Sequence, residues 1–308
     1  MKYKIFKLHF TTGVHVGKGM LSDAEGVFHA DTLFSALCHE ALQFSGGIES
    51  LYEKCKSGRI RFSDGLPYVK DTLYIPKPFL TFDREDDGNS VKKKAFKKLK
   101  YIPFDQINRY LEGNLDAVSE VELLKQLGQN EMRTNVMIKR GEGTEPYYVG
   151  IYHFGKQNGL YVCGVFADEQ EERYFSTLLE AVGATGIGGK RSSGLGKFYI
   201  EEIDCPEDLI RRFTGNHYKN YISLSISLPQ PEEMEIACEG SHYLLLQRSG
   251  FVSSSNYAET FRKKRTTYSF APGSCVQNRY HGDIYDVSCG GNHAVYRYGL
   301  PLFLGVKE

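Results

Sequence analysis

Residues 183–196 constrain this chain more than any other stretch, because glycine is concentrated there. The segment reads Gly-Ala-Thr-Gly-Ile-Gly-Gly-Lys-Arg-Ser-Ser-Gly-Leu-Gly. Glycine lets backbone N–H groups approach an anion closely and takes left-handed conformations, and successive N–H groups form anion-binding nests. A plain connection between two elements rarely needs so many residues. We therefore expect a loop that binds phosphate through its main chain, with Lys190 and Arg191 adding charge.

Two standard nucleotide-binding motifs do not fit this loop. A Gly-x-x-x-x-Gly-Lys-Ser/Thr motif would need glycine at 184 and a hydroxyl residue after Lys190, but Ala184 and Arg191 stand there. A Gly-x-Gly-x-x-Gly motif starting at Gly186 would end on Arg191. The loop is also expected to follow a helix, whereas both motifs follow a strand. An NTP or dinucleotide site is therefore not supported.

The residues around the loop predict regular elements. Asp168 is a good N-cap with Glu171 completing a capping box, and Gly183 is expected to end that helix. A second helix is predicted over 32–44 with Asp31 as its N-cap. Strands are predicted over 4–10, 59–62, 73–75, 146–154, 160–166 and 197–203, and Asn158-Gly159 predicts a hairpin between 146–154 and 160–166. This order predicts a ferredoxin-like (RRM-like) domain.

The rest of the chain suggests a second unit and an insertion. Residues 83–131 are highly charged and have weak periodicity, so we interpret them as an insertion in a first domain spanning 1–215. Residues 216–308 hold strand candidates at 221–228, 243–247, 284–287 and 294–298, which predicts a degenerate second ferredoxin-like domain. The expected fold class is α+β.

Charge and cysteine usage narrow the class of protein. The chain has 38 basic and 38 acidic residues, but they are segregated, with six lysines and no acid between Lys92 and Lys100 and four consecutive cations at 262–265. Such segregation makes a positive face on a neutral molecule. Seven irregularly spaced cysteines favour a reducing compartment. The first residues indicate a strand rather than a signal peptide, and no apolar run is long enough for a membrane span, so we expect a cytoplasmic protein.

The glycine loop, placed between a helix and a closing strand, resembles the G-rich loop of the RAMP superfamily of CRISPR proteins. His15-Val16-Gly17 followed by His29-Ala30-Asp31-Thr32-Leu33-Phe34 is similar to the RAMP subunit that caps the crRNA 5′ end in type III-A (Csm) effector complexes. Arg248-Ser249-Gly250-Phe251, the basic run 262–265, Ala271-Pro272-Gly273-Ser274 and 293–299 follow in the order of that family. The resemblance spans nearly the whole chain except the insertion.

The resemblance implies partners and a role. It implies binding of the repeat-derived 5′ tag of crRNA, contact with the large HD–polymerase-type subunit and with a backbone RAMP subunit, and only indirect contact with target RNA. It implies no catalytic residue and no cofactor. The residues expected to contact RNA are His15, Lys18, Arg133, Lys139, Arg140, Gly186, Gly188, Gly189, Lys190, Arg191, Ser192, Ser193, Gly194, Arg248, Gly250, Phe251, Lys263, Lys264 and Arg265.

Several residues keep alternative interpretations. His15 is a candidate RNA contact, a structural histidine, or the general base of a metal-independent crRNA-processing endoribonuclease, which is the rival function. Asp31 and Asp23 are acids to check for a catalytic role. Residues 133–143 form either a thumb that wedges between bases, with Met132, Met137 and Ile138 as the apolar wedge, or a solvated hairpin. Cys275, His281, Cys289 and His293 lack a standard zinc spacing, so no metal is expected.

Overall fold

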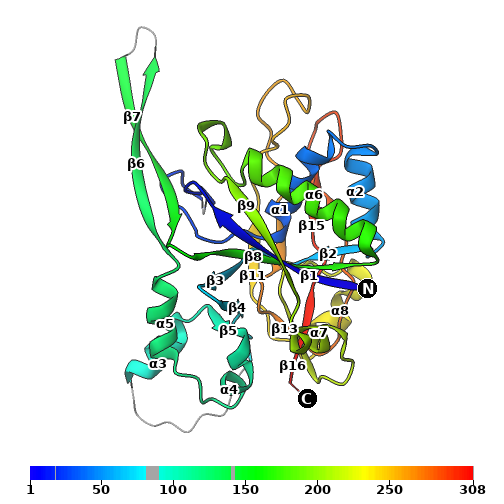
Figure 1. Cartoon of the computed structure of the whole chain (residues 1–308). Helices are drawn as coiled ribbons and strands as arrows, with labels where there is room; N and C mark the ends of the chain where they lie inside the picture. Colours follow the sequence, from blue (N-terminus) through cyan, green and yellow to red (C-terminus); the bar gives the residue numbers. More distant parts are fainter. Residues whose placement is uncertain (18, 81–89, 140–142, 308) are drawn as a thin grey trace.

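The computed structural model describes residues 1–17, 19–80, 90–139 and 143–307 (Figure 1). Its N-terminal sheet is built around β1 (Lys2–Phe10), which pairs antiparallel with β8 (Asn158–Phe166) on one side and β9 (Phe198–Asp204) on the other. Nearly every residue of β8 is buried, as expected for a strand in the middle of a sheet. The predicted strands at 4–10, 160–166 and 197–203 are confirmed within two residues.

The sheet continues beyond β8 through short strands: β2 (Ile60–Phe62), β3 (Leu66–Val69), β4 (Thr72–Pro76) and β5 (Tyr101–Pro103). The order is β5-β4-β3-β8-β1-β9, with β2 also pairing with β8. Strand β1, a helix, β2 and β3, β8, a second helix and β9 follow one another along the chain, which is the succession of a ferredoxin-like unit.

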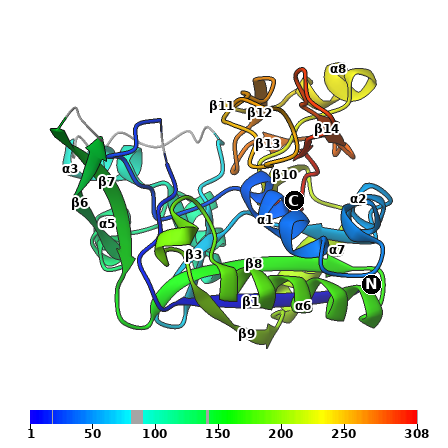
Figure 2. The ribbon, with the colours of Figure 1, turned by 90° about the horizontal axis from the view of Figure 1, so that it is seen from above.

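Three helices pack against this sheet: α1 (Ala30–Ala41), α2 (Gly47–Lys56) and α6 (Glu169–Thr185). Figure 2 shows α6 running along β1 and β8. Buried Phe6, Phe34 and Phe175 belong to the core between helices and sheet. No helix within the described ranges has the length and apolar character needed to cross a bilayer.

The predicted helix ends need correction. Helix α1 begins at Ala30 and its N-cap is His29, so Asp31 is not the cap. Instead, Asp64 Oδ1 accepts a hydrogen bond from the Ala30 N–H at 2.8 Å, which frees Asp31 for another contact. Helix α6 is capped by Asp168 as predicted, but it runs past Gly183 to Thr185. Gly183 lies inside the last turn of α6. A Cβ at this position would clash with the Phe198 carbonyl oxygen, so glycine allows the helix to pack closely against β9.

The predicted hairpin between 146–154 and 160–166 is wrong. Strand β7 (Gly143–Phe154) pairs along its whole length with β6 (Gly128–Lys139), and this β6–β7 hairpin projects from the body of the molecule (Figure 1). After a short turn at 155–157, the chain enters the central sheet as β8. The apolar side chains of β8 are removed from water in the central sheet. They would stay more exposed beside β7, whose outer half is largely exposed.

The charged stretch before this hairpin folds into helices α3 (Ser90–Lys98), α4 (Ile107–Leu111) and α5 (Ala117–Lys125), with β5 and a 3-10 turn η1 (Phe104–Gln106) between them. Ala95, Leu99 and Ile107 are buried in a second core, which also includes residues of β3 to β5. Asp116 caps α5 by accepting the Val118 and Ser119 N–H groups. The acids at 83–87 lie outside the described residues.

The elements of the remaining chain are α7 (Glu207–Thr214), β10 (Asn220–Ser223), η3 (Pro231–Glu233), α8 (Met234–Cys238), β11 (Leu245–Arg248), β12 (Thr267–Phe270), β13 (Cys275–Val276), β14 (Ile284–Asp286), β15 (Tyr296–Tyr298) and β16 (Phe303–Lys307). Figure 2 shows much of this part, including β11, β12, β14 and α8, on the other side of α1 from the central sheet. Strand order is β13-β10-β16, with β11–β12 and β14–β15 as separate pairs.

The two halves share one core. Tyr298 stacks on Phe62 with ring centroids 4.4 Å apart, and Asp64 accepts the Ile226 N–H at 2.8 Å as well as that of Ala30. The C-terminal half is therefore fixed against the first turn of α1. The predicted α+β class is confirmed.

Candidate nucleic-acid interface

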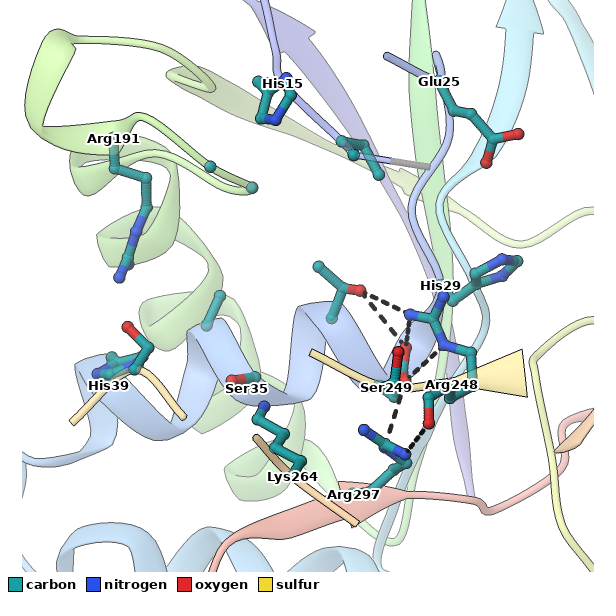
Figure 3. Close-up of a pocket in the computed structure, with 18 of the residues that line it drawn as sticks. His15, Glu25, His29, Ser35, His39, Arg191, Arg248, Ser249, Lys264 and Arg297 are labelled. Atoms are coloured by element: carbon teal, nitrogen blue, oxygen red, sulfur yellow. Dashed lines mark hydrogen bonds and ion pairs between the residues drawn. The ribbon is translucent and has the colours of Figure 1, made fainter. Parts of the chain in front are cut away.

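A pocket of about 280 Å³ lies where the glycine-rich segment, α1 and the C-terminal half meet (Figure 3). It gathers six of the residues that the sequence predicted to contact RNA: His15, Gly188, Gly189, Arg191, Arg248 and Lys264. These residues come from three distant parts of the chain, and the shared core described above brings them together.

The glycine-rich segment folds back on residues 13–15. Gly188 has φ +88°, and a Cβ at that position would stand 2.5 Å from the His15 carbonyl oxygen. The Gly189 N–H donates to the same oxygen at 2.8 Å. Gly186 (φ +94°) and Gly194 (φ +82°) are also left-handed. The close approach to His15 and the positive φ values explain why glycine is required in this loop.

His15 is held in place by the fold. Its ring is buried, and Nδ1 is 2.7 Å from the Gly150 carbonyl oxygen on β7. A Cβ on Gly189 would stand 2.7 Å from its Cδ2, so the ring packs directly under the loop. His15 therefore supports the glycine-rich loop through packing against Gly189.

Two cations are directed into the pocket. Figure 3 shows Arg191 reaching from the loop toward His39 of α1, while Lys264 approaches Ser35. Neither Arg191 nor Lys264 makes a side-chain hydrogen bond or ion pair with any other described residue. Burial and then the charges of Arg297 and Arg248 lower the pKa of Lys264. Burial, followed by Arg191, lowers the pKa of His39, so that ring is neutral near pH 7.

A buried ion pair forms one wall of the pocket. Arg248 donates to both Asp31 oxygens, Nε to Oδ2 at 2.9 Å and Nη2 to Oδ1 at 2.7 Å, and Arg297 Nε lies 3.8 Å from Oδ2. Burial opposes the charge of Asp31, but Arg248 outweighs it and lowers the pKa of this carboxyl. Arg248 is thus largely committed to Asp31, which makes it a weaker phosphate ligand than its sequence position suggested.

Comparisons with known proteins identify the family. Two Mycobacterium tuberculosis strains carry a protein called "CRISPR system Cms protein Csm4" that is 36% identical over 309 residues, covering 100% of this chain and 99% of the relative. A Streptococcus thermophilus protein of the same name is 30% identical over 315 residues, covering 100% of both chains. The chain belongs to the Csm4 family.

The C-terminal half and the overall fold agree with that assignment. Residues 216–306 match the family model of the CRISPR Csm4 C-terminal domain. The fold is similar to a chain of the "Csm3-Csm4 subcomplex in the type III-A CRISPR-Cas interference complex", with TM-score 0.66, 17% identity, and 99% and 100% coverage. It is also similar to a chain of the "Csm1-Csm4 cassette in complex with pppApA", with TM-score 0.65, 19% identity, and 100% and 98% coverage. The resemblance drawn from the sequence is confirmed.

Other parts of the glycine loop face away from the pocket of this Csm4-family chain. Lys190, with φ +58°, places its ammonium over the Tyr147 ring, 5.2 Å from the centroid. Ser192 and Ser193 lie exposed in the 3-10 turn η2 (Arg191–Ser193). These residues form the outer surface of the loop.

The predicted C-terminal contacts separate in the same way. Phe251 is exposed, and Lys263 lies over its ring at 5.7 Å. Gly250 (φ +129°) has open space beside its Cα. Arg265 Nη2 donates to the Asp286 carbonyl at 2.6 Å, so this side chain binds the end of β14. Only Lys264 of the basic run lines the pocket.

The hairpin residues lie outside the pocket. Arg133 is in the middle of β6, opposite Val149, and the hairpin extends well beyond it. Lys139 pairs with Gly143 at the end of β6. Met132 is 64% and Ile138 79% exposed, so the hairpin presents apolar side chains to its surroundings. The predicted contacts Lys18 and Arg140 fall outside the described residues.

Sequence reasoning missed several pocket residues. They are Glu25, His29, Thr32, Ser35, His39, Ser249, Ser253, Tyr296 and Arg297. Thr32, Ser35 and His39 recur at helical spacing, so a polar stripe on an otherwise apolar helix was the available signal. Tyr296 and Arg297 belong to the segment 293–299 that carried the resemblance, but no spacing pattern marked their side chains as pocket residues.

The remaining candidates did not form a site. Among the described residues no three His, Cys, Asp or Glu side chains gather as a metal cluster. Cys275 is buried in β13, whereas Cys289 is exposed. His293 Nε2 is 2.9 Å from Ser254 Oγ. Asp23 is exposed and lines a different hollow near the hairpin root.

Proposed function

We propose that this Csm4-family chain is a non-catalytic subunit of a type III-A CRISPR interference complex, which binds the crRNA 5′ tag and bridges the large polymerase-type subunit to the backbone subunits. The family assignment supports the complex, and the solved Csm3–Csm4 and Csm1–Csm4 assemblies of similar fold support the two protein partners. The chain would act in the cytoplasm.

The observation that carries tag binding is the pocket under the glycine loop. Arg191 and Lys264 enter it from opposite sides, and neither forms an ion pair or a side-chain hydrogen bond with a described residue. Two partly desolvated cations that make no ion pair with a described residue favour an anionic ligand, and phosphate contacts fix the position of an RNA strand without reading its sequence. Thr32, Ser35 and Ser249 add hydroxyl groups for sugar or base edges.

The geometry of His15 supports binding rather than cleavage. A general base must reach the 2′-hydroxyl proton through a free ring nitrogen. Nδ1 of His15 lies 2.7 Å from the Gly150 carbonyl oxygen, so Nε2 is the nitrogen that could act as a base, but the ring is only 6% exposed and is packed under the loop. Incubation of the purified protein with labelled repeat RNA in EDTA tests the endoribonuclease alternative. Cleavage at one site that is lost in His15→Ala or His39→Ala would contradict the non-catalytic role.

A pair of double variants tests the proposed contacts. In Arg191→Gln/Lys264→Gln the two pocket cations are removed. The matched control Lys190→Gln/Lys263→Gln removes the neighbouring cations, which lie over Tyr147 and Phe251 instead. With assembled complex and crRNA, we expect the pocket variant to lower the slope of log affinity against log salt by about 1.4, as for two lost phosphate contacts on single-stranded RNA.

The control is expected to change that slope by less than half as much. Equal slopes for wild type and the pocket variant would contradict the assignment of Arg191 and Lys264. A larger effect from the control would move the RNA contact to the outer surface of the loop.

A further inference from the structure

Helix α3 carries an exposed row of lysines that the tag-binding pocket does not use. Lys94, Lys97 and Lys98, here called the α3 lysine face, are exposed and stand three and four residues apart, so they share one side of the helix. The opposite side packs into the second core through Ala95, and Leu99 follows just beyond the helix.

This arrangement does not favour helix stability. Like charges at positions i and i+4, as in Lys94 and Lys98, destabilise a helix, and only the cations in the last turn gain from the helix dipole. Within the described part of the chain, no ion pair or hydrogen bond offsets the three ammonium groups. A further cation lies at the end of this helix, where Lys77 Nζ donates to the Phe96 carbonyl at 2.7 Å. Three lysines held together on one exposed side of a helix form a concentrated positive surface, which attracts anions.

A second hollow lies beside the segment that follows α3. This hollow, of about 610 Å³, lies at the root of the β6–β7 hairpin, and its lining includes Lys100, Tyr101 and Tyr152 together with the acids Asp23, Glu25 and Glu131. Glu25 lines both the hollow and the pocket under the glycine loop, so the two are neighbours. Lys100 is two residues beyond the end of α3.

We propose that the α3 lysine face is a second RNA contact, which binds the phosphate backbone of a single-stranded segment independently of its sequence. The inference rests on the proposed function, because it assumes a complex that already holds RNA. A row of exposed lysines matches the way single strands are bound, through a positively charged surface that follows the backbone.

A protein partner fits this surface less well. The centre of a protein–protein interface is depleted of charged residues, whereas the exposed side of α3 is mostly lysine. Val91 is its one large exposed apolar side chain among the described residues. RNA is therefore the occupant that the charges favour.

The test uses the assembled complex with Lys94→Gln/Lys97→Gln/Lys98→Gln. Glutamine has nearly the same helix propensity as lysine, so we expect an unchanged or slightly raised melting temperature. One arm measures crRNA affinity, and the other measures affinity for a complementary target RNA with a single-stranded 3′ flank. In one of these arms the slope of log affinity against log salt should be lower than that of wild type by about 2. The affinity of the variant should then fall about sixteenfold less than that of wild type between roughly 50 and 200 mM salt.

The matched control is Lys2→Gln/Lys156→Gln/Lys219→Gln, three exposed lysines outside α3, and its slopes should equal those of wild type. The arm that changes tells which RNA occupies the surface. Unchanged slopes in both arms would overturn the inference, and so would loss of a protein subunit with RNA affinity intact. If the Arg191/Lys264 variant binds normally while the α3 variant does not, the pocket assignment fails and this inference stands.

Discussion

Asp31 and Arg248 form a two-point ion pair between the first turn of α1 and the end of β11, with donor–acceptor distances of 2.9 and 2.7 Å. The two residues are 217 positions apart in sequence, and Arg297 adds a third charge 3.8 Å from Asp31. Because both arginines line the pocket, this buried carboxylate fixes the pocket wall and reduces its positive charge at the same time.

Asp31→Asn should destabilise the protein strongly. The substitution keeps the shape of the side chain but leaves Arg248 and the buried Arg297 without a countercharge, and breaking a buried pair in this way costs about 3 kcal/mol or more. Urea unfolding measures the free energy of unfolding, and Glu259→Gln, at an exposed acid without an ion pair in the described residues, is the control. A loss no larger than that of the control would show that the ion pair contributes nothing to stability.

The pair between His29 and Asp64 predicts a pH dependence. Burial opposes protonation of His29, but the charge and hydrogen bond of Asp64, with Nδ1 2.6 Å from Oδ2, outweigh it and raise the pKa of the ring. A raised pKa stabilises the folded state below the unfolded value of 6.5, and this contribution is lost as pH rises through the folded value.

The measurement compares wild type with His29→Gln by urea unfolding on both sides of the ordinary histidine pKa, from about pH 6 to about pH 9. The difference in free energy of unfolding should be largest at the acidic end and shrink toward the basic end. A difference that stays constant or grows with pH would mean that the His29 pKa is not raised by Asp64.

Two glycines of the loop should respond differently to alanine. Both Gly188 and Gly194 have positive φ, so each alanine carries a left-handed strain of about 1–2 kcal/mol. At Gly188 the new Cβ would also meet the His15 carbonyl oxygen at 2.5 Å, while at Gly194 there is open space. We expect Gly188→Ala to lower the melting temperature and crRNA affinity clearly more than Gly194→Ala. Equal effects would contradict the described contact between the loop and His15.

The sequence predicted the elements that depend on local signals. The Asp168 cap, the apolar face of α6 and the strands of the central sheet follow from spacing and capping residues that act within a few positions. The glycine loop was also predictable, because no other residue accepts its conformations so readily.

What the sequence could not show depends on distant partners. Asp31 is a residue type that often caps helices, but the Ala30 N–H at the start of α1 donates to Asp64 instead, and Asp31 forms an ion pair with Arg248. Nothing in the sequence near Asp31 indicates either contact. The predicted strand partner of β7 was wrong because Asn158-Gly159 suggested a tight turn between β7 and β8. In the structure β7 pairs with β6, and the buried strand β8 pairs with β1 in the central sheet. The sequence identifies Arg191 and Lys264 as cations in the glycine loop and in the basic run. Only the fold shows that these two line one pocket and that Lys190 and Lys263 do not.

The most direct test of the central claim is photo-crosslinking in the assembled complex, using crRNA with a photoreactive nucleotide at each position of the 5′ tag in turn. Mass spectrometry then locates the crosslinked residues on this chain. The account predicts crosslinks to residues 186–194, to α1 near Ser35 and His39, and to the segment around Lys264. Tag crosslinks that all lie elsewhere on the chain, with none at these three places, would contradict it.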